Sequence, residues 1–159
     1  MALLLASSAF KNNGTIPAKY TCDGDSKLSP PLSISGVPEG TKSLVLIMDD
    51  PDIPQFVKEK YGIEVFDHWT VSNIPSETCE IPEGAIVGTE GLNGAGAKGY
   101  TGPCPPPEHE PNEHRYIFKL YALSGLLDFD AAPTKQQVLN ALEPLLLAEA
   151  ELIGRYSRT

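Results

Sequence analysis

The sequence is poor in cysteine, in positive charge and in long apolar runs. Its three cysteines, Cys22, Cys79 and Cys104, are far apart and form no CxxC pair. This spacing indicates no disulfide framework, so we predict a reducing, cytoplasmic compartment. Twelve Lys and Arg against 21 Asp and Glu give a net charge of −9, which argues against nucleic acid or an anionic membrane surface as a partner. No apolar run reaches transmembrane length, and Leu3–Leu5 lacks the basic flank of a signal peptide, so we expect no membrane insertion.

Turn-forming residues, in contrast, are abundant. Fifteen prolines and 14 glycines in 159 residues favour short strands over long helices. The length and composition fit one domain over residues 1–159. The apolar run Ser43–Met48 predicts a strand that is buried on both faces. Further strands are expected at Leu3–Phe10, Val65–Ile74 and His114–Leu123.

Helical signals concentrate near the C-terminus. Thr134, with Gln137 three positions later, resembles a capping box and predicts a helix. Pro144 interrupts the pattern and fits the first turn of a second short helix, Leu145–Leu152. A shorter helical excursion is expected at Gln55–Gly62. Many short strands with one or two C-terminal helices predict a mainly β, sandwich-like domain.

The segment Gly99–Tyr121 joins a stiff loop to a buried strand. Four prolines between positions 103 and 107 exclude a helix or a central strand there. The following run is rich in Tyr, Ile, Phe and Leu, and it begins with His114. A histidine where a rigid loop meets a sheet is a candidate binding residue.

Three polar side chains lie at strand ends or inside strands: Asp50, His68 and His114. Each has an ordinary interpretation, as a hydrogen-bonded core histidine or as a carboxylate in an Asp-Pro turn. Strand ends lie close together at each end of a β-sandwich, so one pocket at such an end can contain all three side chains. His109 lies in an acidic loop and is interpreted as a solvated side chain.

Other chemistry is less well supported. Gly94–Gly99 matches GxGxxG, but no helix can follow it, so a dinucleotide site is rejected. A metal site is disfavoured because the histidines lack metal-type spacing. Cys104 is interpreted as a small apolar residue; the alternative is a hydrolase in which His114 or His68 activates its thiol.

Taken in order, these motifs resemble the phosphatidylethanolamine-binding protein family, in its prokaryotic Raf-kinase-inhibitor-like branch. The resemblance rests on Asp50-Pro51-Asp52-Ile53-Pro54, His68-Trp69, Gly102-Pro103-Cys104-Pro105-Pro106 and His114-Arg115-Tyr116. It implies an antiparallel β-sandwich with a small anion pocket at one end and a cis Ile53–Pro54 bond. By motif, the pocket residues would be Asp50, His68, Gly102, Pro105, His114 and Tyr116, with Asp52 and Tyr100 as neighbours.

The resemblance also implies a function. We expect a protein without a cofactor that binds a small phosphate-containing or zwitterionic ligand and regulates a kinase or serine protease, with a homodimer left open. Inhibition of a protease through the stiff segment Pro105–Glu113 is a further alternative. The chain departs from the family at Ala95, where an aromatic is usual, at the long acidic loop Pro107–Glu113, and at Glu143-Pro144, where a Gly-His pair is usual.

The pocket makes physical sense with one complication. Imidazoles and backbone N–H groups near Gly102 can donate to phosphate oxygens. Asp50 would repel phosphate as a bare carboxylate. It can instead orient a histidine, or it can receive the ammonium of a zwitterionic head group, and the sequence leaves both roles open.

Overall fold

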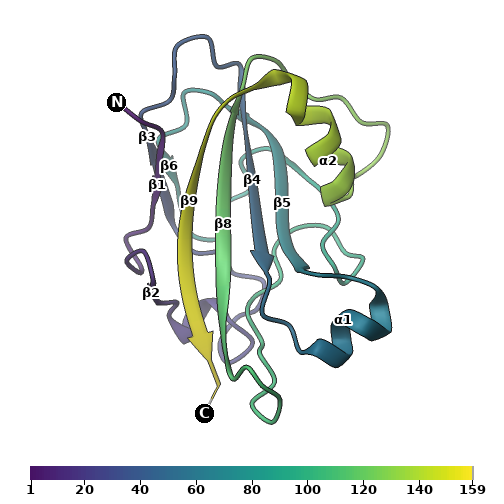
Figure 1. Cartoon of the computed structure of the whole chain (residues 1–159). Helices are drawn as coiled ribbons and strands as arrows, with labels where there is room; N and C mark the ends of the chain where they lie inside the picture. The colour runs from purple at the N-terminus through teal and green to yellow at the C-terminus, as the bar shows by residue number, and fades with distance from the viewer. Residues whose placement is uncertain (159) are drawn as a thin grey trace.

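The computed structural model describes residues 1–158, which form two sheets packed face to face (Figure 1). One sheet has the order β1 (Leu4–Ala6), β3 (Leu32–Ser35), β6 (Glu80–Ile81). The other has the order β2 (Gly14–Thr15), β9 (Leu146–Ser157), β8 (Glu113–Leu123), β4 (Ser43–Asp50), β5 (Phe66–Pro75), β7 (Thr89–Glu90). All pairings are antiparallel except the short one between β2 and β9. The predicted mainly β sandwich is confirmed.

Strand β4 lies at the centre of the larger sheet and is buried along its whole length, as its apolar run predicted. Leu44, Leu46 and Met48 contribute to the core between the sheets. Val45 and Ile47 contribute to a second core on the opposite face. Because successive side chains on a strand alternate between faces, the two aspartates that end β4 serve different sides of the sheet.

Helix α2 (Lys135–Leu142) covers that second core (Figure 1). The predicted capping box is confirmed, because Thr134 Oγ1 accepts from the Gln137 N–H and Gln137 Oε1 accepts from the Thr134 N–H. Lys135 anchors the first turn through ion pairs to Asp49 of β4 at 3.0 Å and Asp67 of β5 at 2.9 Å. Asp49 is thus occupied on the α2 side of the sheet, away from Asp50.

The second C-terminal helix expected at Leu145–Leu152 is wrong. A 3-10 turn over Glu143–Leu145 contains Pro144, and the chain then enters β9, which pairs with β8 along its length. Pairing with a long neighbouring strand overrides local helix propensity here. At the N-terminus only Leu4–Ala6 of the expected Leu3–Phe10 is strand. The expected helix near Gln55 is present as α1 (Gln55–Tyr61).

The cysteine prediction is also wrong. Cys22 and Cys104 form a disulfide across a sequence separation of 82, with their Cα atoms 5.3 Å apart, and Cys79 is free and exposed. The fold joins them because the Cys22 N–H donates to the carbonyl of Pro103 at 3.0 Å. Because these two cysteines form a disulfide, cysteine usage no longer favours a reducing compartment, and the cytoplasmic location stays a prediction. In residues 1–158, no helix has the length and apolarity needed to cross a membrane.

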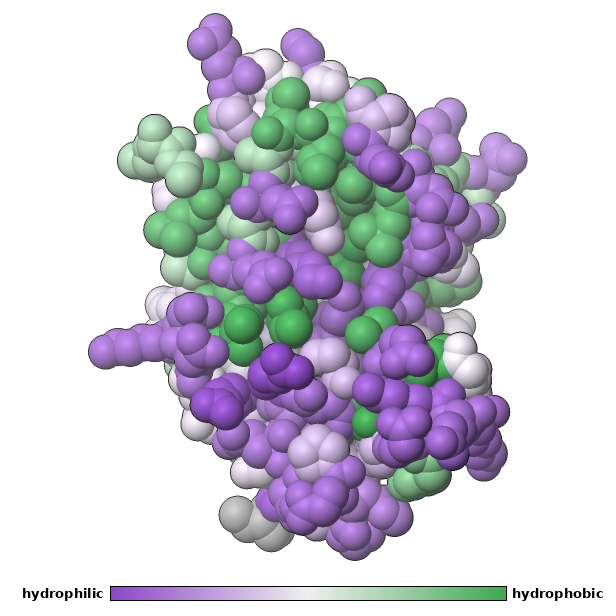
Figure 2. All heavy atoms as spheres, in the orientation of Figure 1, coloured by the Kyte–Doolittle hydropathy of each residue, from purple (hydrophilic) through white to green (hydrophobic). Residues whose placement is uncertain are grey.

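The two ends of the sandwich differ at the surface. In the view of Figure 2, apolar side chains gather in the upper half, and hydrophilic ones dominate the lower end, where α1 and the C-terminus lie in Figure 1. The large exposed apolar residues include Leu126, Leu146 and Leu147. The cavity that contains the candidate site opens at the α1 end.

Candidate functional site: a histidine-lined cavity

A cavity of about 260 Å³ lies between α1, the ends of β4, β5 and β8, and the proline-rich loop. Six of the eight predicted pocket residues line it: Asp50, His68, Gly102, Pro105, His114 and Tyr116. The remaining lining residues are Ile53, Pro54, Val57, Phe66, Thr101, Cys104 and Pro106. The expected cis Ile53–Pro54 bond is wrong, since the single cis peptide within residues 1–158 is Glu110–Pro111.

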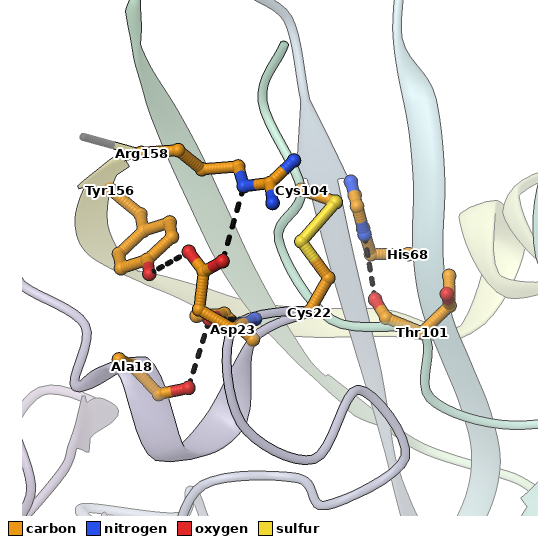
Figure 3. Close-up of a disulfide and its surroundings, with 9 residues drawn as sticks. Ala18, Cys22, Asp23, His68, Thr101, Cys104, Tyr156 and Arg158 are labelled. Carbon is orange, nitrogen blue, oxygen red and sulfur yellow. Dashed lines mark hydrogen bonds and ion pairs between the residues drawn. A yellow bond between two sulfur atoms is a disulfide. The ribbon is translucent and has the colours of Figure 1, made fainter. Parts of the chain in front are cut away.

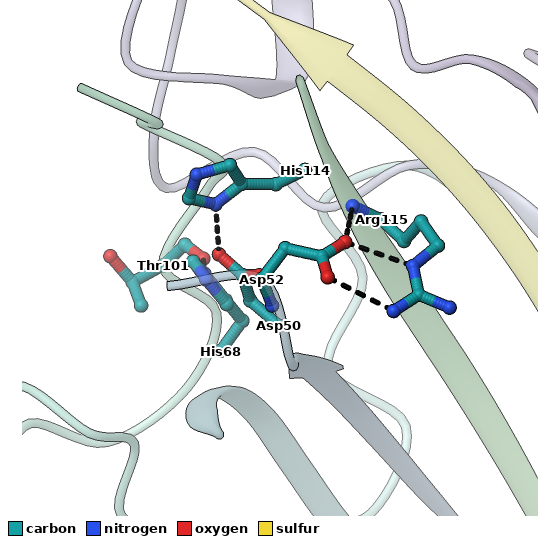
Figure 4. A network of polar contacts seen from close by, with 6 residues as sticks. All are labelled: Asp50, Asp52, His68, Thr101, His114 and Arg115. Atoms are coloured by element: carbon teal, nitrogen blue, oxygen red, sulfur yellow. Dashed lines mark hydrogen bonds and ion pairs between the residues drawn. The ribbon is translucent and has the colours of Figure 1, made fainter. Parts of the chain in front are cut away.

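Asp50 and His114 form a buried pair at the back of the cavity (Figure 4). His114 Nδ1 lies 2.6 Å from Asp50 Oδ2, and the two side chains are 2% and 4% exposed. The other carboxylate oxygen, Oδ1, accepts from the Asp52 N–H at 2.8 Å. Because a carboxylate only accepts, His114 carries its proton on Nδ1 and turns Nε2 away from Asp50. Two roles were left open for Asp50. Its contact with His114 supports the first of them, in which the carboxylate orients a histidine.

His68 reaches the cavity through a β-bulge. In the β4–β5 register Met48 lies opposite Trp69 and Asp49 lies opposite Asp67, so His68 has no partner residue on β4. Trp69 packs into the core between the sheets, and His68 lines the cavity. Bulges commonly redirect a side chain next to a binding site, and the extra residue separates the roles of these two neighbours.

The protonation state of His68 follows from its contacts. Its Nδ1 lies 2.7 Å from the Thr101 carbonyl oxygen, which can only accept, so the proton is on Nδ1. Burial lowers the pKa of the imidazole below its ordinary 6.5, against the raising effects of the Thr101 hydrogen bond and of Asp50. At neutral pH His68 is therefore uncharged, with a lone pair on Nε2.

This lowered pKa makes stability depend on pH. The unfolded chain takes up a proton at His68 near pH 6.5, whereas the folded protein takes it up only at lower pH. The unfolded state binds more protons in that window, so the free energy of unfolding should fall as pH falls from about 7 to 5, by at most about 1.4 kcal/mol per pH unit for one proton. Urea titrations across this range should give a shallower dependence of the free energy of unfolding on pH for His68→Gln than for the wild-type protein. An unchanged slope in His68→Gln would contradict the assignment.

Two buried polar atoms in the cavity wall have no partner. His114 Nε2 and Tyr116 Oη are both buried and without a hydrogen bond in residues 1–158. The Tyr116 ring stacks with His114 at 6.2 Å and meets His68 edge-on at 5.2 Å between ring centroids. Burial raises the pKa of the Tyr116 phenol, so it stays a neutral donor. Unpaired buried polar atoms are costly unless a ligand or water satisfies them.

The loop contributes shape more than hydrogen-bond donors. Of the N–H groups near Gly102 that were expected to donate to a ligand, that of Gly102 itself is used within the chain, because it donates to the Ser26 carbonyl at 2.8 Å. The Thr101 N–H donates to the His68 carbonyl at 2.9 Å, and the prolines have no N–H. Gly102 is needed for close approach, since a Cβ there would lie 2.5 Å from the Tyr20 carbonyl oxygen.

Asp52 and Tyr100 lie outside the cavity lining. Asp52 accepts from the N–H and the guanidinium of Arg115, with each contact between 2.8 and 2.9 Å (Figure 4). The Arg115 hydrogen bond lowers the pKa of this carboxyl, and the contact ties the turn after β4 to β8. Tyr100 packs edge-on against Trp69 and donates its hydroxyl to the Tyr20 carbonyl at 2.8 Å. Both residues support the walls around the cavity.

Cys104 lines the cavity as half of a disulfide (Figure 3). Its sulfur is bonded to Cys22, so it provides no thiolate, and the hydrolase alternative built on Cys104 fails for this structure. Beside the disulfide, Asp23 pairs with Arg158 at 3.2 Å and accepts from the Tyr156 hydroxyl. These contacts fix the Cys22 turn to β9, and the disulfide fixes the loop to that turn.

The site also has an apolar part that was not expected from the sequence. Val57 of α1 and Phe66 of β5 line the cavity, and both also line a neighbouring cavity of about 400 Å³ that reaches Gly94, next to Ala95. At the opening of the cavity, the loop that follows the prolines contacts α1, because the rings of His109 and Phe56 pack with their centroids 4.7 Å apart. The usable signal was Phe66 two positions before His68, which places both on one face of a strand.

Comparisons with known proteins agree with this geometry. The profile described as phosphatidylethanolamine-binding protein matches residues 6–157. A UPF0098 protein of Methanothermobacter thermautotrophicus is 43% identical over 164 residues, which cover 97% of this chain and 98% of the relative.

Two crystal structures are similar along the whole chain. A putative phosphatidylethanolamine-binding protein homologue, CT736 of Chlamydia trachomatis, has a TM-score of 0.90 at 43% identity, with 99% of each chain covered. YbcL of E. coli, described as a member of the mammalian PEBP family, has a TM-score of 0.84 at 29% identity, with 100% of each chain covered. This chain therefore belongs to the phosphatidylethanolamine-binding protein family.

Proposed function

We propose that the chain binds a small phosphate-containing ligand, free or as a zwitterionic head group, in the cavity of His68 and His114. The observation that carries the proposal is the pair of unpartnered buried atoms, His114 Nε2 and Tyr116 Oη, in the wall of one cavity. A ligand oxygen can accept from the phenol, and the imidazole nitrogen can donate or accept according to its protonation. A volume of about 260 Å³ suits a head group rather than a large cofactor.

A zwitterionic ligand fits the charges better than a bare dianion. The chain has a net charge of −9, and Asp50 lies in the cavity wall. An ammonium group on the ligand offsets this negative potential. Phosphoethanolamine combines both groups and is the first ligand to test.

We also propose a regulatory role in which a kinase or serine protease contacts the mouth of the cavity. The loop of residues 107–113 is exposed throughout, and it carries Glu108, Glu110 and Glu113. Contact between His109 and Phe56 holds this acidic loop against α1 at the mouth. A ligand in the cavity lies behind this surface, so occupancy can be transmitted to a partner through the loop.

The test is titration with phosphoethanolamine followed by NMR of the imidazole resonances. The chain has three histidines, so the spectrum compares two rings that line the cavity with one at its mouth. The proposal predicts saturable shifts at His68 and His114, which line the cavity, and a smaller shift at His109, which contacts Phe56 at its mouth. An unperturbed His68 and His114 would reject it. A residual-activity assay against serine proteases, with and without the ligand, tests the regulatory part.

A further inference from the structure

The cavity has a fixed hydrogen-bond acceptor where an anion site usually has a donor. His68 Nδ1 is committed to the Thr101 carbonyl at 2.7 Å, so Nε2 is the atom left for the cavity. With the proton on Nδ1, Nε2 carries a lone pair and accepts. An ionised oxyanion oxygen also only accepts, so it would meet this lone pair as an unfavourable contact.

Hydrogen-bond donors from the chain are scarce around the same cavity. Four of the residues 101–107 are prolines without an N–H, and the N–H groups of Thr101 and Gly102 are used within the chain. Within residues 101–107, the N–H of Cys104 is the one that has no backbone acceptor in residues 1–158. Tyr116 Oη is the one neutral side-chain donor that is buried and unpaired there. A fully ionised oxyanion would therefore leave several oxygens without donors.

We propose, on the basis of the proposed function, that the site selects phosphate monoesters that keep one acidic proton, and that His68 Nε2 accepts the hydrogen bond from this P–OH group. The protonated ligand supplies the donor that the chain lacks. It also carries one negative charge fewer near Asp50. His68 is thus a specificity-determining residue. Because its Nε2 accepts a hydrogen bond and cannot donate one, it disfavours anions that have no acidic proton.

The proposal separates ligands of nearly equal shape. A phosphate monoester loses its second proton near pH 6, so its protonated form is well populated from mildly acidic pH up to neutrality. A phosphodiester, which is the phosphate of a phospholipid, has no such proton, and neither has a sulfate ester. The site should therefore favour free monoesters over lipid phosphodiesters and over sulfates.

Acid also charges histidines, so the pH dependence needs a control ligand. The charged or titratable groups that face His68 come from β4 and β8, while the loop 101–106 brings no charged side chain. On the cavity side these groups are Asp50, His114 and Tyr116, while the charge of Asp49 acts on His68 from the α2 side of the sheet. Protonation of an imidazole would strengthen binding of every anion alike. Protonation of the ligand strengthens binding of the monoester alone.

The experiment measures the affinity of methyl phosphate, dimethyl phosphate and methyl sulfate between about pH 5.5 and 8 by NMR of His68 and His114. Near pH 6 methyl phosphate should bind about tenfold tighter than either of the others, because they leave the acceptor unpaired. Its affinity should fall above about pH 6, in step with loss of its second proton, while that of methyl sulfate changes less.

A variant tests the role of His68 itself. His68→Gln introduces an amide that can donate, so the preference for methyl phosphate over methyl sulfate should shrink toward unity. Cys79→Ser, at the free and exposed cysteine outside the cavity, should keep the preference. Equal affinities for all three ligands in the wild-type protein would overturn the inference, and so would parallel pH profiles for phosphate and sulfate. In either case binding of phosphoethanolamine would leave the proposed function intact. If neither phosphoethanolamine nor any of the three esters binds, the proposed function is wrong and the inference falls with it.

Discussion

Removal of the Cys22–Cys104 disulfide is expected to lower the free energy of unfolding by about 4 kcal/mol, because a cross-link between residues 82 positions apart restricts a long loop of the unfolded chain. The same change should weaken ligand binding, since Cys104 lines the cavity and the bond fixes the loop to the Cys22 turn. Urea denaturation of Cys22→Ser and Cys104→Ser measures the first effect. Titration with phosphoethanolamine measures the second.

Cys79 provides the matched control. This cysteine is free and exposed, so Cys79→Ser should unfold at the wild-type urea concentration. Reduction of the wild-type protein should reproduce the effect of the two serine variants, and it should leave those variants themselves unchanged. Equal stability of the wild-type protein with and without reductant would show that the disulfide contributes nothing to the folded state.

Loss of the His114 imidazole is the second change with a large expected effect. In His114→Phe the buried carboxylate of Asp50 loses its partner at 2.6 Å, and an uncompensated buried charge costs about 3–5 kcal/mol. The free energy of unfolding should fall by about that amount. Phosphoethanolamine binding should also be lost, because Nε2 of this ring is one of the two unpartnered atoms in the cavity.

A second substitution separates charge from packing. Asp50→Asn removes the charge and retains an oxygen that can accept from the Asp52 N–H. The double variant His114→Phe/Asp50→Asn should therefore recover part of the stability lost in His114→Phe. If adding Asp50→Asn lowers stability further, the cost of losing His114 lies in packing and not in the unpaired carboxylate.

The sequence predicted those features that arise locally. The apolar run Ser43–Met48 could belong only to a strand covered on both faces, and β4 is such a strand. Thr134 and Gln137 form the capping box that their spacing indicated. The ordered motifs around Asp50, His68 and His114 were specific enough to name the family and to place these residues in one cavity.

The failures are features that depend on distant segments. Leu145–Leu152 has helix-forming residues, but most of this segment belongs to β9, which pairs with β8 through backbone hydrogen bonds. Cys22 and Cys104 are joined by the loop that brings Pro103 to the Cys22 turn, and their spacing in the sequence does not show it. Backbone N–H groups near Gly102 were expected to face a ligand, but the N–H of Gly102 itself donates to the carbonyl of Ser26, a residue far earlier in the chain. Which groups remain free for a ligand was therefore beyond the reach of the sequence.

A crystal of the protein soaked in phosphoethanolamine tests the central claim most directly. The account predicts a phosphate group in the cavity of His68 and His114, with oxygens within hydrogen-bond distance of His114 Nε2 and Tyr116 Oη. Density for the ligand elsewhere on the surface, with the cavity filled by water alone, would contradict it.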